Sequence, residues 1–240
     1  MARVLELFSG TGSVGKVCKQ LDWEVVSVDM LLPADHQVDI MEFDYKQYPK
    51  DYFDIVWGSP PCTDYSQLKK CNFGRKLKDG TIYTKEQNLK DQDEADKLVL
   101  KTFEIIDYFQ PELWFVENPQ AGDLKNRDIM KGKPFYDVDY CMYSNWGYKK
   151  RTRIWTNKPD WNNLLCDGKG TCGNMINTKH KLNVSKDVHT IGERKMKHKS
   201  TCDGGYDKRT KKVEGQLNSG TTKLDRYRIP EDLIFSLFCD

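Results

Sequence analysis

The sequence has no long apolar run and little net charge. Its 240 residues carry a formal charge of only +2, and no stretch approaches the roughly 18 consecutive apolar residues that a membrane span needs. The chain runs directly into Val-Leu-Glu-Leu-Phe, without the pattern of a secretory signal peptide. We therefore expect no membrane contact and an intracellular location, in the cytoplasm of a prokaryotic or virus-infected host or in a nucleus.

The cysteines do not form the even, closely spaced framework of a disulfide-rich domain. Eight of them are scattered along the chain, at positions 18, 62, 71, 141, 166, 172, 202 and 239. In a reducing compartment such residues are free thiols, metal ligands or nucleophiles.

Charge is unevenly distributed. Residues 158–228 contain sixteen Lys and Arg against eight Asp and Glu, a net charge of +8 that leaves −6 for the rest of the chain. This pattern fits a region that binds a polyanion, and it fits a solvated lysine-rich loop region equally well.

Short β-prone runs alternate with helical periodicity in the first 157 residues. The runs are residues 4–8, 24–30, 54–59 and 112–119, and helical spacing occurs at 14–21 and 92–109. This alternation predicts a mostly parallel α/β sheet. Beyond residue 157 periodicity is lost until residues 229–238, which predict a short C-terminal helix.

A glycine-rich turn, Phe-Ser-Gly-Thr-Gly-Ser-Val-Gly, follows the first run. Closely spaced glycines let a backbone approach a ligand, and Asp29 stands about 20 residues on, where an acid binds ribose hydroxyls. Asp39 and Ile40 are candidates to flank an adenine. The lysine of a phosphate-binding P-loop is missing, so an adenosine-bearing cofactor is favoured over a triphosphate. An ordinary tight turn with a surface acid is the alternative.

Two prolines stand directly before Cys62 at the end of the third run. Alone, such a cysteine is more often structural than nucleophilic. In an open α/β sheet, however, ligands bind outside the carboxyl ends of the strands, and Glu117 and Asn118 also stand at such an end. A rigid loop that presents a thiol beside a carboxylate suits attack on a heteroaromatic ring.

Arg151 and Arg153 alternate on the strand predicted within Lys-Lys-Arg-Thr-Arg-Ile-Trp. Alternate strand residues share a face, so both guanidiniums are candidates to bind one anion or one acidic side chain. A basic face on an edge strand is the alternative.

These motifs, in this order, resemble those of the cytosine-C5 DNA methyltransferases, in a compact form like that of viral and phage members. The resemblance covers residues 1 to about 157 and rests mainly on Pro-Pro-Cys together with Glu-Asn-Pro. It implies a class I S-adenosylmethionine-dependent methyltransferase fold, with a Rossmann-like, mostly parallel sheet and a small basic target-recognition region. The implied partner is double-stranded DNA, bound by a monomer.

The resemblance also implies a reaction. Cys62 would attack C6 of a flipped-out cytosine, Glu117 would hold the ring, and Arg151 and Arg153 would support the nucleotide and the active-site loop. Contacts to S-adenosyl-L-methionine are implied for Phe8, Ser9, Gly10, Thr11, Gly12, Ser13, Val14, Asp29, Met30, Asp39, Ile40, Ser59 and Pro60. Contacts to the substrate are implied for Pro61, Ser66, Gln67, Asn118 and Pro119.

The sequence departs from the family pattern in several places. Pro119 stands where valine is usual, and Lys149 replaces a common glutamine. The expected division is a catalytic domain at residues 1–157, a target-recognition region at 158–228, which is short for this family, and a helix at 229–240 that packs back on the catalytic domain. A related enzyme acting on transfer RNA and a non-catalytic DNA-binding member are the alternatives, whereas amino-group methylation is disfavoured because those enzymes lack the cysteine.

The basic region contains further candidate sites. Residues 193–199 and 208–212 are lysine-rich stretches suited to phosphate contacts. Zinc is not favoured, because C-x5-C lacks the usual spacing and the histidines form no knuckle, so we expect free thiols and no metal. The candidate ligands are Cys166, Cys172, His180, His189, His198 and Cys202.

Overall fold

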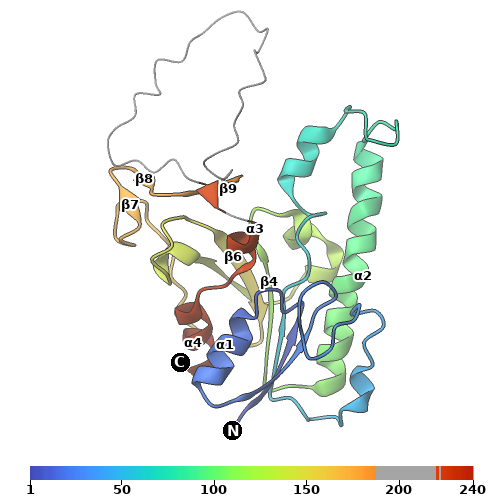
Figure 1. Ribbon diagram of the computed structural model, residues 1–240, viewed down its shortest axis with the longest axis vertical. Coiled ribbons are helices and arrows are strands. Elements are labelled where there is room, and N and C mark those ends of the chain that lie inside the picture. The colour runs from blue at the N-terminus through green and yellow to red at the C-terminus, as the bar shows by residue number, and fades with distance from the viewer. Residues whose placement is uncertain (188–219, 222, 240) are drawn as a thin grey trace, which may run out of the picture.

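The computed structural model describes residues 1–187, 220–221 and 223–239 (Figure 1). Six strands form one sheet in the order β2-β1-β3-β4-β6-β5. Strands β2, β1, β3 and β4 are parallel, whereas β6 is antiparallel to both of its neighbours. The strands are β1 (Arg3–Leu7), β2 (Glu24–Val28), β3 (Ile55–Gly58), β4 (Leu113–Pro119), β5 (Phe135–Asp139) and β6 (Arg151–Thr156).

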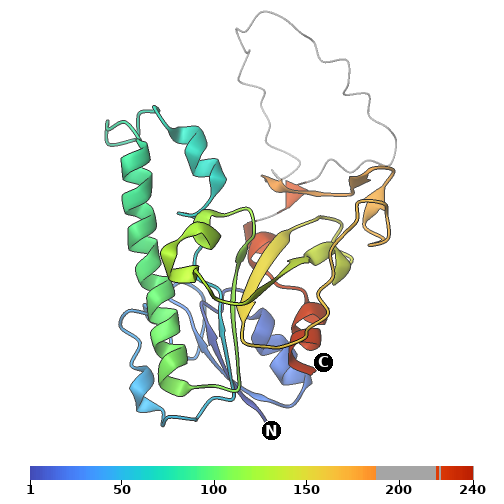
Figure 2. The same ribbon diagram turned by 180° about the vertical axis from the view of Figure 1, so that it is seen from behind.

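Helices cover both faces of this sheet. Helix α2 (Lys85–Phe109) lies along one face, and α1 (Ser13–Gln20) and α4 (Glu231–Cys239) lie against the other (Figures 1 and 2). Two buried apolar clusters fill the two layers, one around Val99, Phe109 and Val116 and the other around Val14, Phe115 and Leu237. The mostly parallel sheet between helical layers confirms the predicted α/β, Rossmann-like class.

The remaining elements are short. The 3-10 helices are η1 (Tyr45–Gln47), η2 (Gln67–Asn72), η3 (Asp123–Asn126), η4 (Asp128–Met130) and η5 (Tyr140–Met142). The others are β7 (Met175–Ile176), β8 (Lys179–His180), β9 (Asn183–Asp187), β10 (Gly220–Thr221) and α3 (Lys223–Tyr227). Within the described ranges, no helix is long and apolar enough to span a membrane.

Helix α2 is longer than its apolar periodicity predicted. It begins at Lys85 rather than at residue 92, because Thr84 Oγ1 accepts a hydrogen bond of 3.1 Å from the Gln87 N–H and caps the first turn. It ends where Gln110 adopts a left-handed conformation with φ of 47° before Pro111, which cannot continue a helix. Most side chains in the first turns of α2 are exposed, so this part of the sequence has no apolar stripe from which a helix could be predicted.

Strand β5 was not predicted from the sequence. It forms the sheet edge and pairs antiparallel with β6, with Asp137 opposite Arg153 and Asp139 opposite Arg151. Its sequence, Phe-Tyr-Asp-Val-Asp, carries acids that disfavour strands. The two acids are accommodated here because each faces an arginine on β6.

The C-terminal helix closes the face that carries α1. Phe238 stacks on Trp23 with ring centroids 5.7 Å apart and meets the edge of Trp57 at 6.2 Å. The Ile229 N–H donates a hydrogen bond of 3.1 Å to Ser13 Oγ. The end of the chain is therefore tied to the turn that follows β1. The lysine-rich stretches at 193–199 and 208–212, with His189, His198 and Cys202, lie outside the described residues.

Glu6 is a buried carboxyl group beneath the turn that follows β1. Its two oxygens accept hydrogen bonds from the N–H groups of Val14 (3.1 Å) and Gly15 (3.0 Å), in the first turn of α1. Desolvation by burial outweighs these bonds and raises the pKa of Glu6 from 4.5 to about 7. Glu6 had no role in the sequence analysis, because a single acid in an apolar strand carries no motif.

This raised pKa predicts a pH-dependent stability. Between pH 4.5 and 7 the folded chain retains a proton that the unfolded chain has lost, so the free energy of unfolding falls as the pH rises through this window. Glu6→Gln removes this titration. The free energy of unfolding of the variant minus that of wild type should therefore increase by on the order of 3 kcal/mol between pH 4.5 and pH 7.5. Urea unfolding at a series of pH values measures this difference. The exposed Glu42→Gln is the matched control, and parallel curves for wild type and Glu6→Gln would contradict the assignment.

Candidate active site

The turn after β1 is built from left-handed backbone. Phe8, Gly10 and Gly12 have φ of 56°, 53° and 65°, and the Gly12 N–H donates a hydrogen bond of 2.8 Å to the Ser9 carbonyl. Glycine adopts this conformation without strain, whereas a residue with a side chain, such as Phe8, is strained in it. A Cβ atom added at Gly12 would find no heavy atom within 4 Å. Conformation, rather than crowding by the chain itself, thus explains the glycine at this position.

Asp29, at the tip of β2, is joined to this turn. Asp29 Oδ2 accepts a hydrogen bond of 2.9 Å from the Gly10 N–H, and Oδ1 accepts bonds of 2.8 Å from the N–H groups of Leu31 and Leu32. The Ser9 N–H donates to the Val28 carbonyl at 3.1 Å, which fixes the same turn to β2. The acid predicted to bind a ribose therefore also organises the loops around it.

The other predicted cofactor residues differ in their surroundings. Asp39 Oδ1 accepts a hydrogen bond of 2.9 Å from the Met41 N–H. Ile40 is buried in the apolar layer beneath α2, whereas the Met30 side chain is 54% exposed. Thr11 Oγ1 lies 3.1 Å from Ser13 Oγ, and Val14 is buried in the layer that contains α4. The Ser59 N–H donates to the Leu7 carbonyl at 3.2 Å, which brings the end of β3 beside the turn.

One atom of this turn fits the presence of a ligand. Ser9 Oγ is buried, and it has no hydrogen-bond partner within the part of the chain that the structure describes. A buried hydroxyl without a partner is costly unless a bound molecule or water satisfies it. Together with the left-handed turn and the acid at the tip of β2, this hydroxyl fits an adenosine-bearing cofactor.

The loop that carries Cys62 is fixed to β4 by a buried hydrogen bond. Asn118 is fully buried, and its Nδ2 donates a bond of 2.9 Å to the Pro60 carbonyl. Pro60 and Pro61 restrict the backbone φ angles before Cys62, whose side chain is half-buried. Asn118 Oδ1 is a buried acceptor for which the described residues provide no donor. The structure thus joins the Pro-Pro-Cys and Glu-Asn-Pro motifs directly.

Glu117, the residue before Asn118, is held by two groups that the sequence analysis did not single out. The Tyr140 hydroxyl donates a hydrogen bond of 3.1 Å to Glu117 Oε1, and Lys150 Nζ lies 3.5 Å from the same oxygen. Lys150 Nζ also donates to the Arg226 carbonyl at 3.0 Å and lies 4.7 Å from the centre of the Tyr140 ring. Lys150 stands beside the arginine pair in sequence, but nothing in the lysine-rich pattern separates it from Lys149.

The electrostatic surroundings of Cys62 come from the same groups. Burial is the main influence and raises the pKa of the Cys62 thiol, and the Glu117 carboxylate raises it further. The Lys150 ammonium and, more weakly, Arg226 act in the opposite direction. The resting thiol is therefore protonated near neutral pH, and its ionisation depends on the balance between Glu117 and Lys150.

Arg151 and Arg153 share one face of β6, as predicted, but they do not bind one shared acid. Arg151 binds Asp139 through hydrogen bonds of 3.0 and 2.7 Å, and Arg153 binds Asp137 through bonds of 2.7 and 2.9 Å. Glu117 is opposite Ile154 in the ladder, so strand alternation places Glu117 on the other face. Both guanidiniums therefore belong to the β5–β6 edge, whereas Lys150 is the cation beside Glu117.

The rest of the loop after Cys62 is bound to neighbouring elements. Gln67 Nε2 donates to Asp123 Oδ1 at 2.6 Å, and Ser66 Oγ accepts a long bond of 3.3 Å from the Leu68 N–H. The carbonyl of Pro119 accepts a bond of 2.9 Å from the Gly122 N–H. Ser66 and Gln67 thus make contacts within the protein that hold the loop in place.

A network on the other side of this loop attaches it to α2. The buried Tyr65 hydroxyl donates a hydrogen bond of 2.8 Å to Asp96 Oδ1, and Arg127 Nε donates to Asp96 Oδ2 at 2.8 Å. The site as a whole therefore has a rigidly held thiol, a buried carboxylate and an ammonium group, beside a turn suited to an adenosine. This arrangement can add a sulfur nucleophile to a planar ring whose polar edge binds the carboxylate.

The chain is similar in sequence to known DNA methylases that act on cytosine. The sequence profile described as C-5 cytosine-specific DNA methylase matches residues 30–131. A protein of Frog virus 3 (isolate Goorha), described as a probable DNA (cytosine-5)-methyltransferase, is 38% identical to the chain over 237 residues. That alignment covers 98% of each protein.

Solved structures with a similar arrangement are more distant. The methyltransferase EhMeth of Entamoeba histolytica is 16% identical, with a TM-score of 0.45 over 69% of this chain and 56% of its own. The Dnmt2 methyltransferase of S. pombe is 13% identical, with a TM-score of 0.42 over 78% of this chain and 61% of its own. This chain thus spans little more than half the length of these two structures.

The balance around Cys62 predicts how its reactivity responds to charge. Lys150→Met removes the ammonium and should raise the pKa of Cys62, so alkylation by iodoacetamide at pH 8 should slow roughly three- to tenfold. Glu117→Gln should lower the pKa and speed alkylation. Peptide mapping by mass spectrometry separates Cys62 from the exposed Cys71 and Cys239.

The matched control for this experiment is Lys97→Met, which removes an exposed ammonium whose ion-pair partner among the described residues is Glu94 on α2. Its alkylation profile should match that of wild type. Equal pH profiles for wild type, Lys150→Met and Glu117→Gln would show that neither group acts on the thiol.

Proposed function

The chain belongs to the C-5 cytosine-specific DNA methylase family, and from this premise we propose that it methylates C5 of a flipped-out cytosine in DNA through a covalent bond to Cys62. The observation that carries the proposal is the buried hydrogen bond from Asn118 to the Pro60 carbonyl. It holds the thiol loop against the strand end that carries Glu117. Attack within a fixed site requires such near-attack geometry.

S-adenosyl-L-methionine is the proposed methyl donor, and when bound it supplies an electrophilic methyl group. The turn from Phe8 to Val14 would hold it, with Asp29 near the ribose, Asp39 and Ile40 near the adenine, and Met30, Ser59 and Pro60 at the margins. The buried Ser9 hydroxyl, which has no hydrogen-bond partner among the described residues, and the left-handed turn support this assignment.

Cys62 and Glu117 would carry the ring chemistry. The Cys62 thiol passes its proton to Glu117, and the thiolate forms a bond to C6 as the electron pair of the C5–C6 double bond moves toward C5. Glu117 binds N3 and the exocyclic amino group and delivers this proton to N3, which stabilises the ring as the thiolate adds. After C5 has been methylated, a base removes the C5 proton and the sulfur–C6 bond breaks, which restores the double bond and the thiolate. N3 returns its proton to Glu117, from which the thiolate recovers it.

Lys150 and Tyr140 act in this proposal as positioning residues. Both contact Glu117 Oε1, which leaves Glu117 Oε2 for the cytosine ring. The Lys150 charge also lowers the pKa of the thiol against the effect of burial. Arg151 and Arg153, through Asp139 and Asp137, would support the nucleotide and the loop indirectly by fixing the β5–β6 edge.

We propose that the nucleic acid approaches the site from beyond the carboxyl ends of the strands. The η2 segment and the β7–β8 segment both project beyond the carboxyl ends of the strands, on opposite sides (Figures 1 and 2). We propose double-stranded DNA bound by a monomer, with residues 1–157 catalytic, 158–228 for target recognition and 229–240 closing the catalytic domain. Pro61, Asn118 and Pro119 would line the base pocket, and Ser66 and Gln67 would support its loop. Extruding a base costs a few kcal/mol, which contacts in the pocket must offset.

Labelled methyl transfer from S-adenosylmethionine to unmethylated duplex DNA tests the reaction. Wild type should form 5-methylcytosine, and Cys62→Ala should lose at least about a thousandfold in rate while it still binds the cofactor in calorimetry. The exposed Cys239→Ala is the matched control and should retain wild-type activity. Duplex DNA containing 5-fluorocytosine should trap a covalent complex with wild type but not with Cys62→Ala. Full activity of Cys62→Ala would overturn the covalent mechanism.

The nucleic acid is tested by competition. Unlabelled duplex DNA should suppress methylation of labelled duplex DNA at lower concentration than transfer RNA does. Incorporation into transfer RNA alone would assign the same site to RNA. Cofactor binding without transfer to either substrate would leave a non-catalytic DNA-binding protein.

A further inference from the structure

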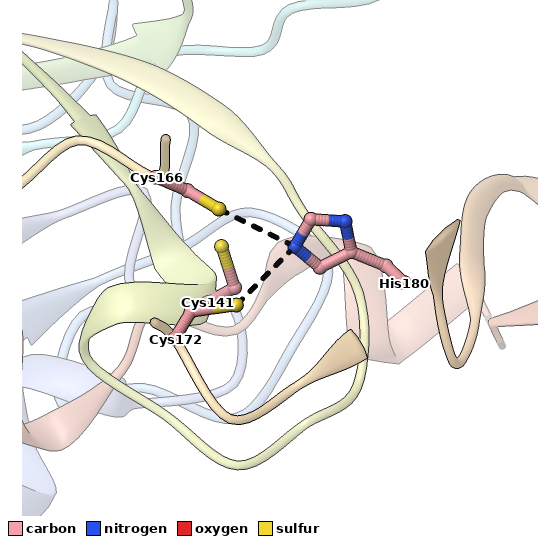
Figure 3. Close-up of side chains that lie close together, drawn as sticks. All are labelled: Cys141, Cys166, Cys172 and His180. Atoms are coloured by element: carbon pink, nitrogen blue, oxygen red, sulfur yellow. Dashed lines mark hydrogen bonds between the residues drawn. The ribbon is translucent and has the colours of Figure 1, made fainter. Parts of the chain in front are cut away.

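We propose that Cys141, Cys166, Cys172 and His180 bind one structural zinc ion. Their three sulfur atoms and one ring nitrogen all lie within 4.8 Å of one another, and Figure 3 shows the side chains converging on one point. Three thiolates and an imidazole are a common ligand set for tetrahedral Zn²⁺. All four positions would be filled by the protein, so the ion would have no open position for catalysis.

The distances fit a shared ion better than they fit direct hydrogen bonds. Zn–S and Zn–N bond lengths place sulfur and nitrogen of a tetrahedral site about 3.6 Å apart. The Sγ atoms of Cys166 and Cys172 lie 3.7 and 3.6 Å from His180 Nε2. A single ring nitrogen has either one hydrogen or one lone pair, so it cannot make a good hydrogen bond to both sulfurs. A cation at the centre explains the convergence on that nitrogen.

The backbone around the four ligands is fixed by buried hydrogen bonds. Asn174 is buried, and its Nδ2 contacts the carbonyls of Cys141 (2.8 Å), Ser144 (2.7 Å) and Cys172 (3.0 Å). The Cys166 N–H donates a bond of 2.8 Å to Asp139 Oδ2. Three of the four ligand residues are therefore positioned by contacts that do not involve their sulfur atoms. Outer contacts of this kind orient metal ligands.

The ligands come from segments that are distant in sequence. Cys141 lies in η5, directly after β5, whereas His180 lies in β8, and Cys166 and Cys172 stand in the chain between β6 and β7. Cys141 stands 25 residues before Cys166, outside the cysteine spacing that led to the expectation of no metal. The proposed ligand set contains Cys141, which the sequence did not indicate, and does not contain Cys202.

The site would attach the start of the basic region to the catalytic sheet. The Leu182 N–H donates a hydrogen bond of 2.7 Å to the Gly147 carbonyl just beyond His180, and the chain then enters β9. Residues 164–182 have few large apolar side chains in the core, so a metal supplies cohesion that packing does not. This role goes beyond methyl transfer and does not depend on it.

The metal content of tag-free protein, purified under reducing conditions and dialysed against a weak chelator, tests the proposal directly. Mass spectrometry of the metals should find about one zinc ion per folded chain. Folded protein with less than about one zinc per ten chains, even after expression with added zinc, would overturn the site. Because this measurement needs no substrate, it is independent of the proposed reaction.

Two half-buried ligands give informative variants. Cys172→Ser should lose the stoichiometric zinc, whereas His180→Cys should keep it, because four thiolates also form a closed zinc site. Cobalt substitution should give sulfur-to-cobalt charge-transfer bands that weaken in Cys172→Ser and strengthen in His180→Cys. The exposed Cys239→Ser is the control and should match wild type. Retention of full zinc by Cys172→Ser, or equal loss from the control, would mean adventitious zinc only.

Discussion

The buried hydrogen bond between Asn118 and the Pro60 carbonyl is the contact on which the candidate site depends. It joins the end of β3 to the end of β4, and it exists because these strands are parallel neighbours with Gly58 opposite Val116. Parallel pairing brings the residues after each strand to one edge of the sheet. The Ser59 N–H donates a hydrogen bond to the Leu7 carbonyl at the same end of the sheet. The loop that carries Cys62, the Glu117 side chain and the glycine-rich turn after β1 therefore have fixed relative positions.

Several ionisable groups at this end of the sheet are buried, and burial and hydrogen bonding together set their protonation. Glu6 and Cys62 both have raised pKa values because desolvation is the largest influence on each. Their charged forms are disfavoured until a neighbour or a substrate compensates. Burial also raises the pKa of Asp139, but hydrogen bonds from Arg151 and from the Cys166 N–H outweigh it, so the net shift is downward. The carboxyl ends of the strands therefore hold a protonated thiol near Glu117 and, on the face of the sheet opposite to Glu117, a fixed ion pair between Arg151 and Asp139.

The sequence predicted strands β1 to β4 and β6, the main helices, and the placement of Cys62 and Glu117 at one end of the sheet, because these depend on periodicity and on the carboxyl ends of parallel strands. It did not predict the partners of Arg151 and Arg153, since both partners stand on β5, whose acids hide its strand character. Lys150 was missed for another reason. Its importance comes from contact with Glu117 and Tyr140, which are adjacent to it only after β4, η5 and β6 have packed together.

Asp139 connects the candidate site to the cysteine cluster. Its carboxylate accepts hydrogen bonds from the Arg151 side chain on β6 and from the Cys166 N–H, and it is fully buried. A shift of Cys166 would therefore disturb the ion pair that fixes the first residue of β6. Lys150, the residue before Arg151, carries the ammonium beside Glu117. An ion held by Cys166 would thus stabilise the start of the basic region and, through Asp139, the strand end that positions Lys150.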